Sequence, residues 1–180
     1  MSAHTNLTEI IYLVVDGNRD SRALTRTTLE SIGIRYVLEA HDARAAMETL
    51  RTVRVGAMIV EMELPGPLSG VEFTKKIRRS DKSLKPEVPI IMLTTNANRQ
   101  TVLDARDAGI HEFLARPLTS GALFDRIKKA VTVPRQFVQE EGYVGPARRW
   151  LGEGSPIPRK KRKVAAGELG HPTVKVFDWT

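Results

Sequence analysis

Five short apolar runs alternate with stretches of helical periodicity over the first 130 or so residues of the chain. The runs are rich in β-branched and other apolar residues, as expected of strands buried on both faces of a parallel sheet. Each run is followed by a polar or charged residue. The pattern therefore predicts five strands, at Ile10–Val15, Tyr36–Ala40, Ala57–Val60, Pro89–Leu93 and Glu112–Ala115.

The segments after the runs have polar N-cap candidates followed by apolar residues at helical spacing. They predict helices from Asp20 or Ser21 to Ile32, from Asp42 through Val53, from Val71 to Arg79, from Asn98 to Ala108, and after Pro117 to Val131. Inward-facing positions are expected at Leu24, Thr28 and Ile32 in the first helix, Ala46, Met47 and Leu50 in the second, and Leu123, Phe124, Ile127 and Val131 in the last.

Strict alternation of strand and helix requires right-handed crossovers and a parallel sheet with helices on both faces. The predicted fold is therefore a doubly wound α/β domain with five strands and five helices. In such sheets a site forms beyond the carboxyl ends of the strands, near the point where the strand order reverses. The residues that follow strands at this edge are Asp16, Glu61, Thr94 and Arg116.

Four segments in order carry a family resemblance: VVDGNRDSR, VEMELP, MLTTNA and FLARPLTSGAL. Over roughly residues 8–132 the chain resembles the receiver domain of response regulators, the flavodoxin-like signalling module of bacterial two-component systems. In that family an acid pair and an acceptor aspartate hold Mg²⁺, and the aspartate takes a phosphoryl group. The resemblance implies that Asp16 is the first of the acid pair, Glu61 the acceptor position, Thr94 the phosphoryl-binding hydroxyl, Arg116 the basic switch residue and Phe113 the aromatic switch residue.

Two departures from the family pattern predict a degenerate phosphorylation site. Gly17 stands where the family has its second acid, so a hard divalent cation loses an oxygen ligand and Mg²⁺ binding should be weak or absent. Glu61 is one methylene longer than aspartate, and phosphoryl transfer depends on close positioning. We therefore expect an atypical receiver that signals by protein–protein contact, without phosphoryl transfer.

Each residue at the strand ends also has a simpler interpretation, and Asp16 is otherwise only a turn or helix-terminus residue. Arg116 keeps the positive charge of the family lysine and can pair with Glu61 through its planar fork, or it is only a surface charge. Glu61 is otherwise a solvated acid in a loop, which is one residue longer than the usual pattern and contains an extra proline. Thr94 is otherwise a cap for the next helix.

Composition removes several classes of function. The chain has no cysteine, and its four histidines, at 4, 41, 111 and 171, have no metal-ligand spacing. There is no glycine-rich phosphate loop and no nucleophile elbow, so we do not expect an enzyme. No apolar run approaches the length of a membrane span, and the start does not read as a signal peptide, which favours a cytoplasmic protein.

The charge changes along the chain. Residues 133–180 hold nine basic and five acidic groups, a net +4 out of +7, and most of this excess is one run of Arg159, Lys160, Lys161, Arg162 and Lys163. This region is rich in glycine and proline, so we expect a receiver-like domain at 1–132 and a C-terminal extension at 133–180. The run PRKKRKV is similar to a short viral nuclear-import signal, but the bacterial resemblance favours a solvated basic segment with weak affinity for nucleic acid or anionic surfaces.

Two alternatives to the atypical receiver stay open: a phospho-accepting response regulator, and a nucleic-acid or nucleotide binder that uses the tail. In the extension, YVGPARRW looks like the "GPDRR" segment that follows some stand-alone receivers. A protein partner from a signalling pathway is expected. A homodimer is also expected through the face formed by the fourth helix, fifth strand and fifth helix, at Arg99, Leu103, Arg106, Asp107, Arg126 and Lys129.

Overall fold

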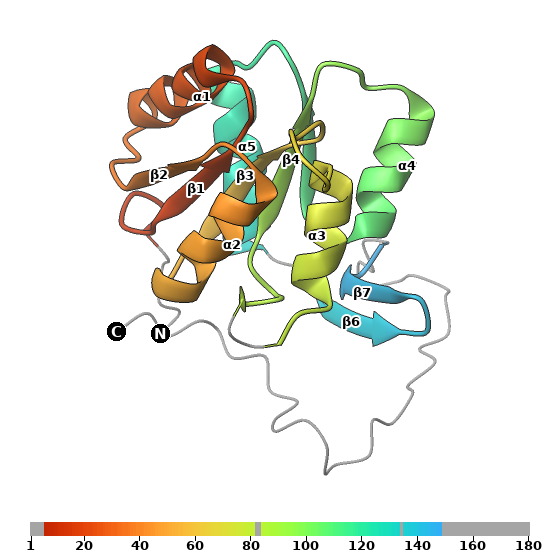
Figure 1. Cartoon of the computed structure of the whole chain (residues 1–180). Coiled ribbons are helices and arrows are strands. Elements are labelled where there is room, and N and C mark those ends of the chain that lie inside the picture. Colours follow the sequence, from red (N-terminus) through yellow and green to blue (C-terminus); the bar gives the residue numbers. More distant parts are fainter. Residues whose placement is uncertain (1–5, 82–83, 134, 149–180) are drawn as a thin grey trace, which may run out of the picture. The chain divides into compact units, whose positions relative to one another are not determined.

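The computed structural model describes residues 6–81, 84–133 and 135–148 (Figure 1). Five parallel strands form one sheet in the order β2-β1-β3-β4-β5. The strands are β1 (Tyr12–Val15), β2 (Val37–Ala40), β3 (Ala57–Glu61), β4 (Ile90–Thr94) and β5 (Glu112–Ala115). Consecutive strands are connected by helices, so the predicted doubly wound α/β fold is confirmed.

Polar N-caps start all five helices, which are α1 (Arg19–Ser31), α2 (Ala43–Thr52), α3 (Gly70–Arg78), α4 (Arg99–Ala108) and α5 (Ser120–Thr132). Asp42 and Asn98 cap α2 and α4 as predicted. Helix α1 begins slightly earlier than expected, because the Asn18 side chain accepts the N–H of Ser21 and is the cap. Within the described ranges, no helix has the length and apolar character needed to cross a bilayer.

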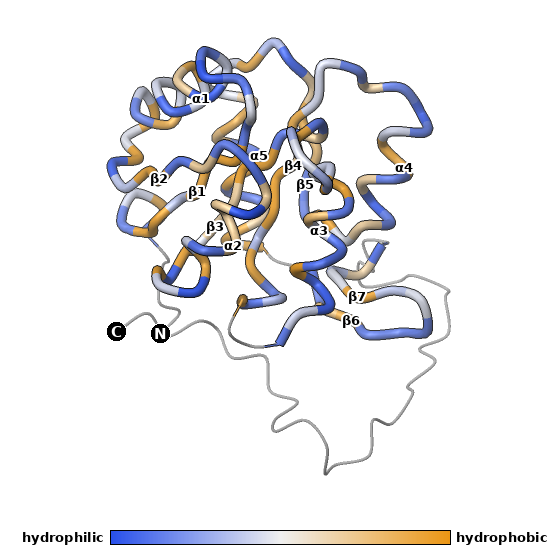
Figure 2. Tube along the Cα trace, in the orientation of Figure 1, coloured by the Kyte–Doolittle hydropathy of each residue, from blue (hydrophilic) through white to orange (hydrophobic). Residues whose placement is uncertain are grey.

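The core consists of two apolar clusters, one on each face of the sheet. Helices α2, α3 and α4 pack on one face, where Phe73 and Ile77 meet Leu13 and Met58. Helices α1 and α5 pack on the other face, where Leu29 and Ile127 are among the buried residues. Figure 2 shows the consequence: the inner strands are apolar along their length, whereas each helix has polar residues on one side and apolar residues on the other.

Two expected inward positions are wrong. In α1 the buried residues are Thr25 and Leu29, while Leu24 is 56% exposed. In α5 Leu123 and Ile127 are buried as predicted, but Phe124 is 38% exposed. In both helices the sheet selects a narrower stripe than the sequence pattern showed, and an apolar residue next to the stripe faces outward.

A β-hairpin follows α5 and packs on the domain. Its antiparallel strands are β6 (Phe137–Glu140) and β7 (Tyr143–Pro146), and β7 contacts both α3 and α4. The compact unit that contains the sheet runs from Thr5 to Arg148 and so includes the hairpin, whereas the domain expected from the composition ends at 132.

The hairpin covers a fully buried arginine, Arg78, which is the last residue of α3. Its guanidinium donates to the carbonyl oxygens of Gly109 (2.7 Å), Val88 (2.9 Å) and Pro86. Phe137 covers it with its ring centroid 5.7 Å from the guanidinium carbon. Burial lowers the pKa of Arg78 to about 9. The sequence gives no sign of this role, since Arg78 reads as a basic residue in the last turn of a helix.

His111, just before β5, lies next to Arg78. We refer to Arg78, His111 and Arg135, at the amino ends of β4 and β5, as the lower cluster. Its Nδ1 accepts the N–H of Ile90 and lies 3.2 Å from Nη2 of Arg78, so Nδ1 carries no proton and the ring is neutral. Burial, followed by the charges of Arg78 and Arg135, lowers the pKa of His111 well below its usual value. Arg135, at the start of the hairpin, donates to the carbonyls of Ile110 and His111. The hairpin is thus joined to the domain by charge-assisted hydrogen bonds.

Candidate functional site

The carboxyl edge of the sheet brings together three of the four residues predicted from the strand ends. Asp16 directly follows β1, Glu61 is the last residue of β3, and Arg116 directly follows β5. The sheet order reverses at β1, whose neighbours are β2 and β3, so this edge contains the crevice of a doubly wound fold.

Arg116 bridges the two carboxylates. Its Nε donates to Oε2 of Glu61 at 3.1 Å, and its Nη2 donates to Oδ2 of Asp16 at 3.0 Å. The three side chains are 13%, 12% and 4% exposed, so the contacts are shielded from solvent and stronger than surface ion pairs. A guanidinium can do this because its donors point in several fixed directions, whereas a lysine has a single point charge.

Asp16 is also held by the first turn of α1. Its Oδ2 accepts the hydroxyl of Ser21 at 2.6 Å, and its Oδ1 accepts the N–H of Asn18 at 2.9 Å. Thr25 adds a longer contact of 3.4 Å to Nη2 of Arg116. The sequence pattern indicates Ser21 only as a possible start of the first helix and gives no role to Thr25, which α1 buries against the sheet. Three donors therefore fix the orientation of the Asp16 carboxylate: one bonds Oδ1 and two bond Oδ2.

Glu61 sits between opposing influences. Burial, the largest cause, raises its pKa; the hydrogen bond and charge of Arg116 lower it, the charge of Asp16 raises it, and the net pKa is raised. Its second oxygen, Oε1, accepts the N–H of Met62 at 3.1 Å. Both carboxylate oxygens of Glu61 thus have protein partners, which excludes the interpretation of Glu61 as a solvated acid.

Gly17, the position where the family has its second acid, faces Pro65. A Cβ atom at residue 17 would lie 2.4 Å from Cδ and 2.8 Å from Cγ of the proline ring. Pro65 belongs to the loop after β3, the loop that the sequence showed to be longer than usual. The loop thus reaches across to the end of β1.

The two switch positions are placed differently. The Thr94 hydroxyl is buried and is used in the turn before α4, where it accepts the N–H of Asn96 at 3.1 Å. Its contact with Arg116 is through the backbone, since the Arg116 N–H donates to the Thr94 carbonyl. Thr94 therefore stabilises the turn that follows β4, and it does not cap α4, whose N-cap is Asn98. Phe113 is half-buried and packs against the cluster beneath α2, α3 and α4.

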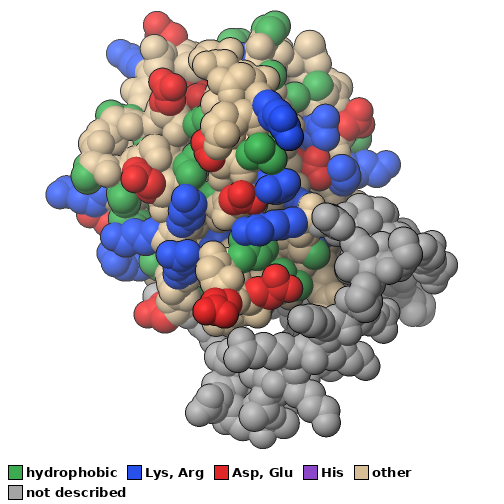
Figure 3. Space-filling model, turned by 90° about the vertical axis from the view of Figure 1, so that its right-hand side faces the viewer, with side chains coloured by type: hydrophobic (Ala, Val, Ile, Leu, Met, Phe, Trp, Pro, Cys, Tyr) green, Lys and Arg blue, Asp and Glu red, His purple; other side chains and the backbone are tan. Residues whose placement is uncertain are grey.

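The predicted dimer face carries charges that pair within one chain. Arg126 and Lys129 of α5 both contact the buried carboxylate of Glu112, at 2.9 and 3.1 Å. Arg106 pairs with Asp107, which also pairs with Arg148 beyond the hairpin. Figure 3 shows the side of the molecule that carries α4, where Lys and Arg side chains gather with Asp and Glu among them. Arg99 is exposed and Leu103 is half-buried.

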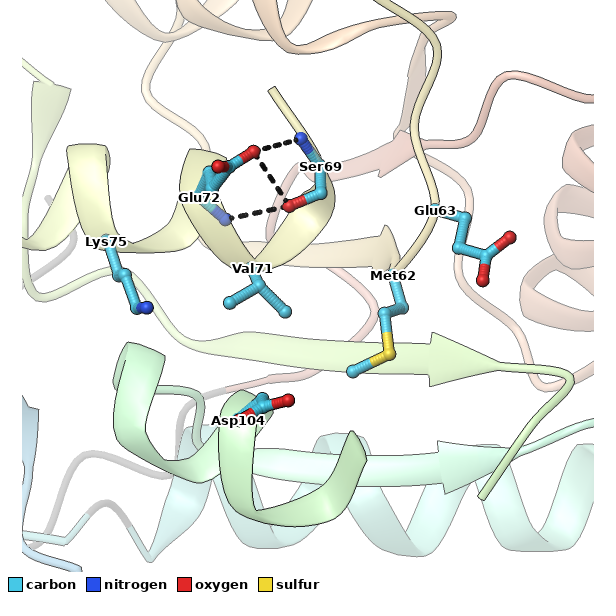
Figure 4. A pocket seen from close by; sticks show the side chains of 7 residues that line it. All are labelled: Met62, Glu63, Ser69, Val71, Glu72, Lys75 and Asp104. Atoms are coloured by element: carbon cyan, nitrogen blue, oxygen red, sulfur yellow. Dashed lines mark hydrogen bonds between the residues drawn. The ribbon is translucent and has the colours of Figure 1, made fainter. Parts of the chain in front are cut away.

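A shallow groove of about 420 Å³ lies beside the site, between α3 and α4 (Figure 4). Its rim includes the capping box of α3, in which Ser69 and Glu72 bond each other's backbone N–H. Met62 and Val71 form its apolar part, and Asp104 reaches it from α4. The capping box uses Glu72, so this acid is part of a helix start.

The donors at the carboxyl edge do not fit a divalent cation. A hard cation takes several oxygen ligands, but Arg116 binds an oxygen of both Asp16 and Glu61, and Gly17 supplies no side chain. Among the residues that the structure describes, no group of three or more His, Cys, Asp or Glu could hold a metal ion. The basic run Arg159–Lys163 lies outside the described residues.

Comparison with known proteins places this geometry in a family. The model of the response regulator receiver domain matches residues 12–128. The chemotaxis protein CheY1 of Helicobacter pylori is 32% identical over 117 residues, which cover 64% of this chain and 92% of that protein. CheY-3 of Vibrio cholerae is 27% identical over 117 residues, covering 65% and 88%.

A solved structure shows the same likeness. It is the receiver domain of a sensor histidine kinase from Pseudomonas aeruginosa, determined with a magnesium ion coordinated in its active site cleft. The two share 27% identity, with a TM-score of 0.61, over 68% of this chain and 98% of that one. The fold, the family match and these relatives agree over the same residues. The chain belongs to the response regulator receiver domain family of two-component signalling.

Proposed function

We propose that this chain is an atypical receiver, which signals through protein–protein contact and does not accept a phosphoryl group. The observation that carries the proposal is the state of Glu61. The residue at the acceptor position has one oxygen bound by Arg116 and the other bound by the Met62 N–H. A nucleophilic carboxylate needs an oxygen free to approach phosphorus, and here that oxygen must first leave a hydrogen bond.

The geometry adds two further obstacles. In-line transfer depends on placement of the reacting atoms to within about 1 Å, and the extra methylene of glutamate moves the carboxylate along the crevice. Transfer also uses cations to neutralise the charge that develops on the phosphoryl group. The positive charge of Arg116 is already balanced by two carboxylates. The basic residue is thus already paired with anionic groups, although no phosphoryl group has been transferred.

The test is phosphotransfer from acetyl phosphate in the presence of Mg²⁺, followed by intact mass. We expect the mass to stay unchanged, while a receiver with an aspartate acceptor, treated in parallel, gains about 80 Da. A gain in this chain that disappears in Glu61→Gln would overturn the proposal and support the alternative, a phospho-accepting response regulator.

The remaining expectations belong to the same proposal. The protein acts on partners rather than on a substrate, so we expect no enzymatic turnover. It resides in the cytoplasm and binds Mg²⁺ weakly or not at all. The tail at 159–163 adds weak, salt-sensitive contact with nucleic acid or anionic surfaces, which a salt titration with and without residues 149–180 tests.

Association through the face of α4, β5 and α5 is also part of the proposal. The ion pairs of Glu112 with Arg126 and Lys129 lower the charge that a second copy could use there. Contacts with a second copy would therefore rely on Arg99 and Leu103. Light scattering at about 100 μM should detect a dimer with a dissociation constant near 10 μM. A monomer at that concentration removes the homodimer from the proposal.

A further inference from the structure

The loop after β3 takes the space of an acid side chain. Residue 17 is glycine because of space rather than because of backbone conformation: Gly17 is not among the glycines with positive φ. A Cβ atom there would lie 2.4 Å from Cδ of Pro65, far inside van der Waals contact. Cδ is bonded to the proline nitrogen and cannot rotate away, so the clash can be relieved only by moving backbone, either that of the loop or that of residue 17.

The loop backbone is fixed at several points. Leu64 and Leu68, on either side of Pro65, pack against the apolar cluster of the domain. At the end of the loop the Gly70 N–H donates to the Met62 carbonyl at 2.7 Å. Gly70 also lies so close to β3 that a Cβ on it would meet the Glu61 carbonyl oxygen at 2.2 Å. Pro65 is therefore held over residue 17 by packing on both sides.

The second occupant of the pocket is Arg116. Its guanidinium touches one oxygen of each of the two acids that face the crevice, at 3.0 and 3.1 Å, and so supplies a positive charge between them. A divalent cation bound by the same acids would lie between them too and would meet the guanidinium as a like charge.

We propose that Arg116 and Pro65 together replace the divalent cation of the receiver pocket, the first by its charge and the second by its volume. The proposal rests on the proposed function, a pocket that works without phosphoryl transfer, and names how that pocket is closed. It has a specific consequence. Restoring the missing acid at residue 17 and shortening Glu61 to aspartate does not restore cation binding, because both occupants stay in place.

The experiment is calorimetric titration of Mg²⁺ into the full chain and three variants. The first variant, Gly17→Asp with Glu61→Asp, restores the acids. The second adds Arg116→Lys and Pro65→Gly. The third is its matched control, in which Pro67→Gly replaces Pro65→Gly: Pro67 is an exposed proline of the same loop. We expect Mg²⁺ binding in the second variant at least about tenfold tighter than in the first and third.

Folding is measured by circular dichroism for every variant. Since Gly17→Asp alone introduces the clash, the first variant is expected to be destabilised. If it does not fold, rescue decides the question: Pro65→Gly must restore folding and Pro67→Gly must not. Equal rescue by both prolines overturns the role of Pro65. Equal Mg²⁺ affinity in the first and second variants, or no binding in a folded second variant, overturns the replacement as a whole.

These outcomes are separate from the failure of the proposed function. A phosphorylated wild-type chain contradicts the proposed function through its mass, whatever the variants bind. Conversely, a wild-type chain that stays unmodified but binds Mg²⁺ as tightly as the second variant keeps the proposal that the chain accepts no phosphoryl group, and overturns the expected weak Mg²⁺ binding together with the replacement of the cation.

Discussion

Two arginines, Arg116 partly buried and Arg78 fully buried, lie at opposite ends of the sheet and have opposite surroundings. Arg116, at the carboxyl edge, contacts two carboxylates and no more than half of its donors are used by them. Arg78, at the amino ends of β4 and β5, contacts three backbone carbonyls and a histidine nitrogen, all neutral. Arginine thus serves as a counter-ion at residue 116 and as a structural hydrogen-bond donor to backbone carbonyls at residue 78.

The difference shows how to tell a functional cation from a structural one. Arg116 is held by carboxylate side chains, which another cation could also attract. Arg78 is held by backbone groups whose direction is set by the fold, and only a multi-donor fork satisfies them together. The charge of the groups that accept hydrogen bonds from the arginine separates the two cases better than the position of the arginine at the crevice does.

The largest effect is expected from removing the counter-ion. Arg116→Met leaves Asp16 and Glu61 buried side by side without a cation, which should lower the free energy of unfolding by about 3 to 5 kcal/mol at neutral pH. Chemical denaturation measures it. The exposed basic residue Arg99, changed to Met, is the control and should stay close to wild type. A small loss in Arg116→Met would mean that the two carboxylates are better solvated than their burial shows.

Removing the Arg78 guanidinium should lower the free energy of unfolding by somewhat less. Arg78→Met fills the volume but leaves the carbonyls of Gly109 and Val88 without donors, and we expect a loss of about 2 to 4 kcal/mol. Lys76→Met, an exposed position on the same helix, serves as the control. Arg78→Lys separates geometry from charge: it should also be destabilised, because one ammonium cannot reach all the acceptors. A fully stable lysine variant contradicts the role of the fork.

Truncation tests whether the hairpin belongs to the domain. Ending the chain after 133 removes the Arg135 hydrogen bonds to the carbonyls of Ile110 and His111 and uncovers Arg78, which we expect to cost about 2 kcal/mol, close to one charge-assisted hydrogen bond. Ending it after 148 should cost nothing measurable. Equal stability of the two truncated chains would support the domain boundary expected from the sequence near 133.

The lower cluster should also respond to pH. Because the pKa of His111 is lowered in the fold, the unfolded chain binds a proton near its usual pKa of about 6.5 while the folded chain does not, so stability falls as the pH drops below that value. The slope approaches about 1.4 kcal/mol per pH unit for one group. Denaturation at several pH values should show this slope, His111→Asn should remove it, and the exposed His41→Asn should keep it.

The expected effect of pH on stability has the opposite sign at Glu61, at the carboxyl edge of the sheet. It is the smallest of the predicted effects. The pKa of Glu61 is raised, so its contribution to stability is present at low pH and is lost as the pH rises through its folded pKa. Glu61→Gln should therefore be as stable as wild type, or more stable by under about 1 kcal/mol, near neutral pH. That difference should vanish in acid. A clear loss of stability at neutral pH would show that the Arg116 contact outweighs burial.

The strands and the site positions were predictable because each rests on a local signal. A buried parallel strand is a short apolar run, and the residue after it lies at the carboxyl edge in any doubly wound fold. Asp16, Glu61 and Arg116 follow from that rule alone. The role of Thr94 did not, because a hydroxyl after a strand can serve either a ligand or its own turn, and the sequence is the same in both cases.

The lower cluster could not be predicted, because its contacts join segments far apart along the chain. Arg78 meets carbonyls of Val88 and Gly109, and nothing in the sequence marks a carbonyl as an acceptor for a side chain. The contact of Pro65 with Gly17 is hidden for the same reason: only the extra length of the loop was visible. Phe124 was misplaced because helical spacing leaves the edge of an apolar stripe undefined.

The close approach of Gly109 and Gly145 bears on how such a protein can be recombined. A Cβ on Gly109 would lie 2.8 Å from the Val144 carbonyl oxygen, and one on Gly145 would lie 2.8 Å from the Cα of Gly109. Gly109 also ends α4 in a left-handed conformation, so it serves the helix and the hairpin at once. A hairpin grafted onto another receiver would need this pair of glycines as well as an arginine beneath it. The hairpin and its domain are therefore exchangeable only as a matched set.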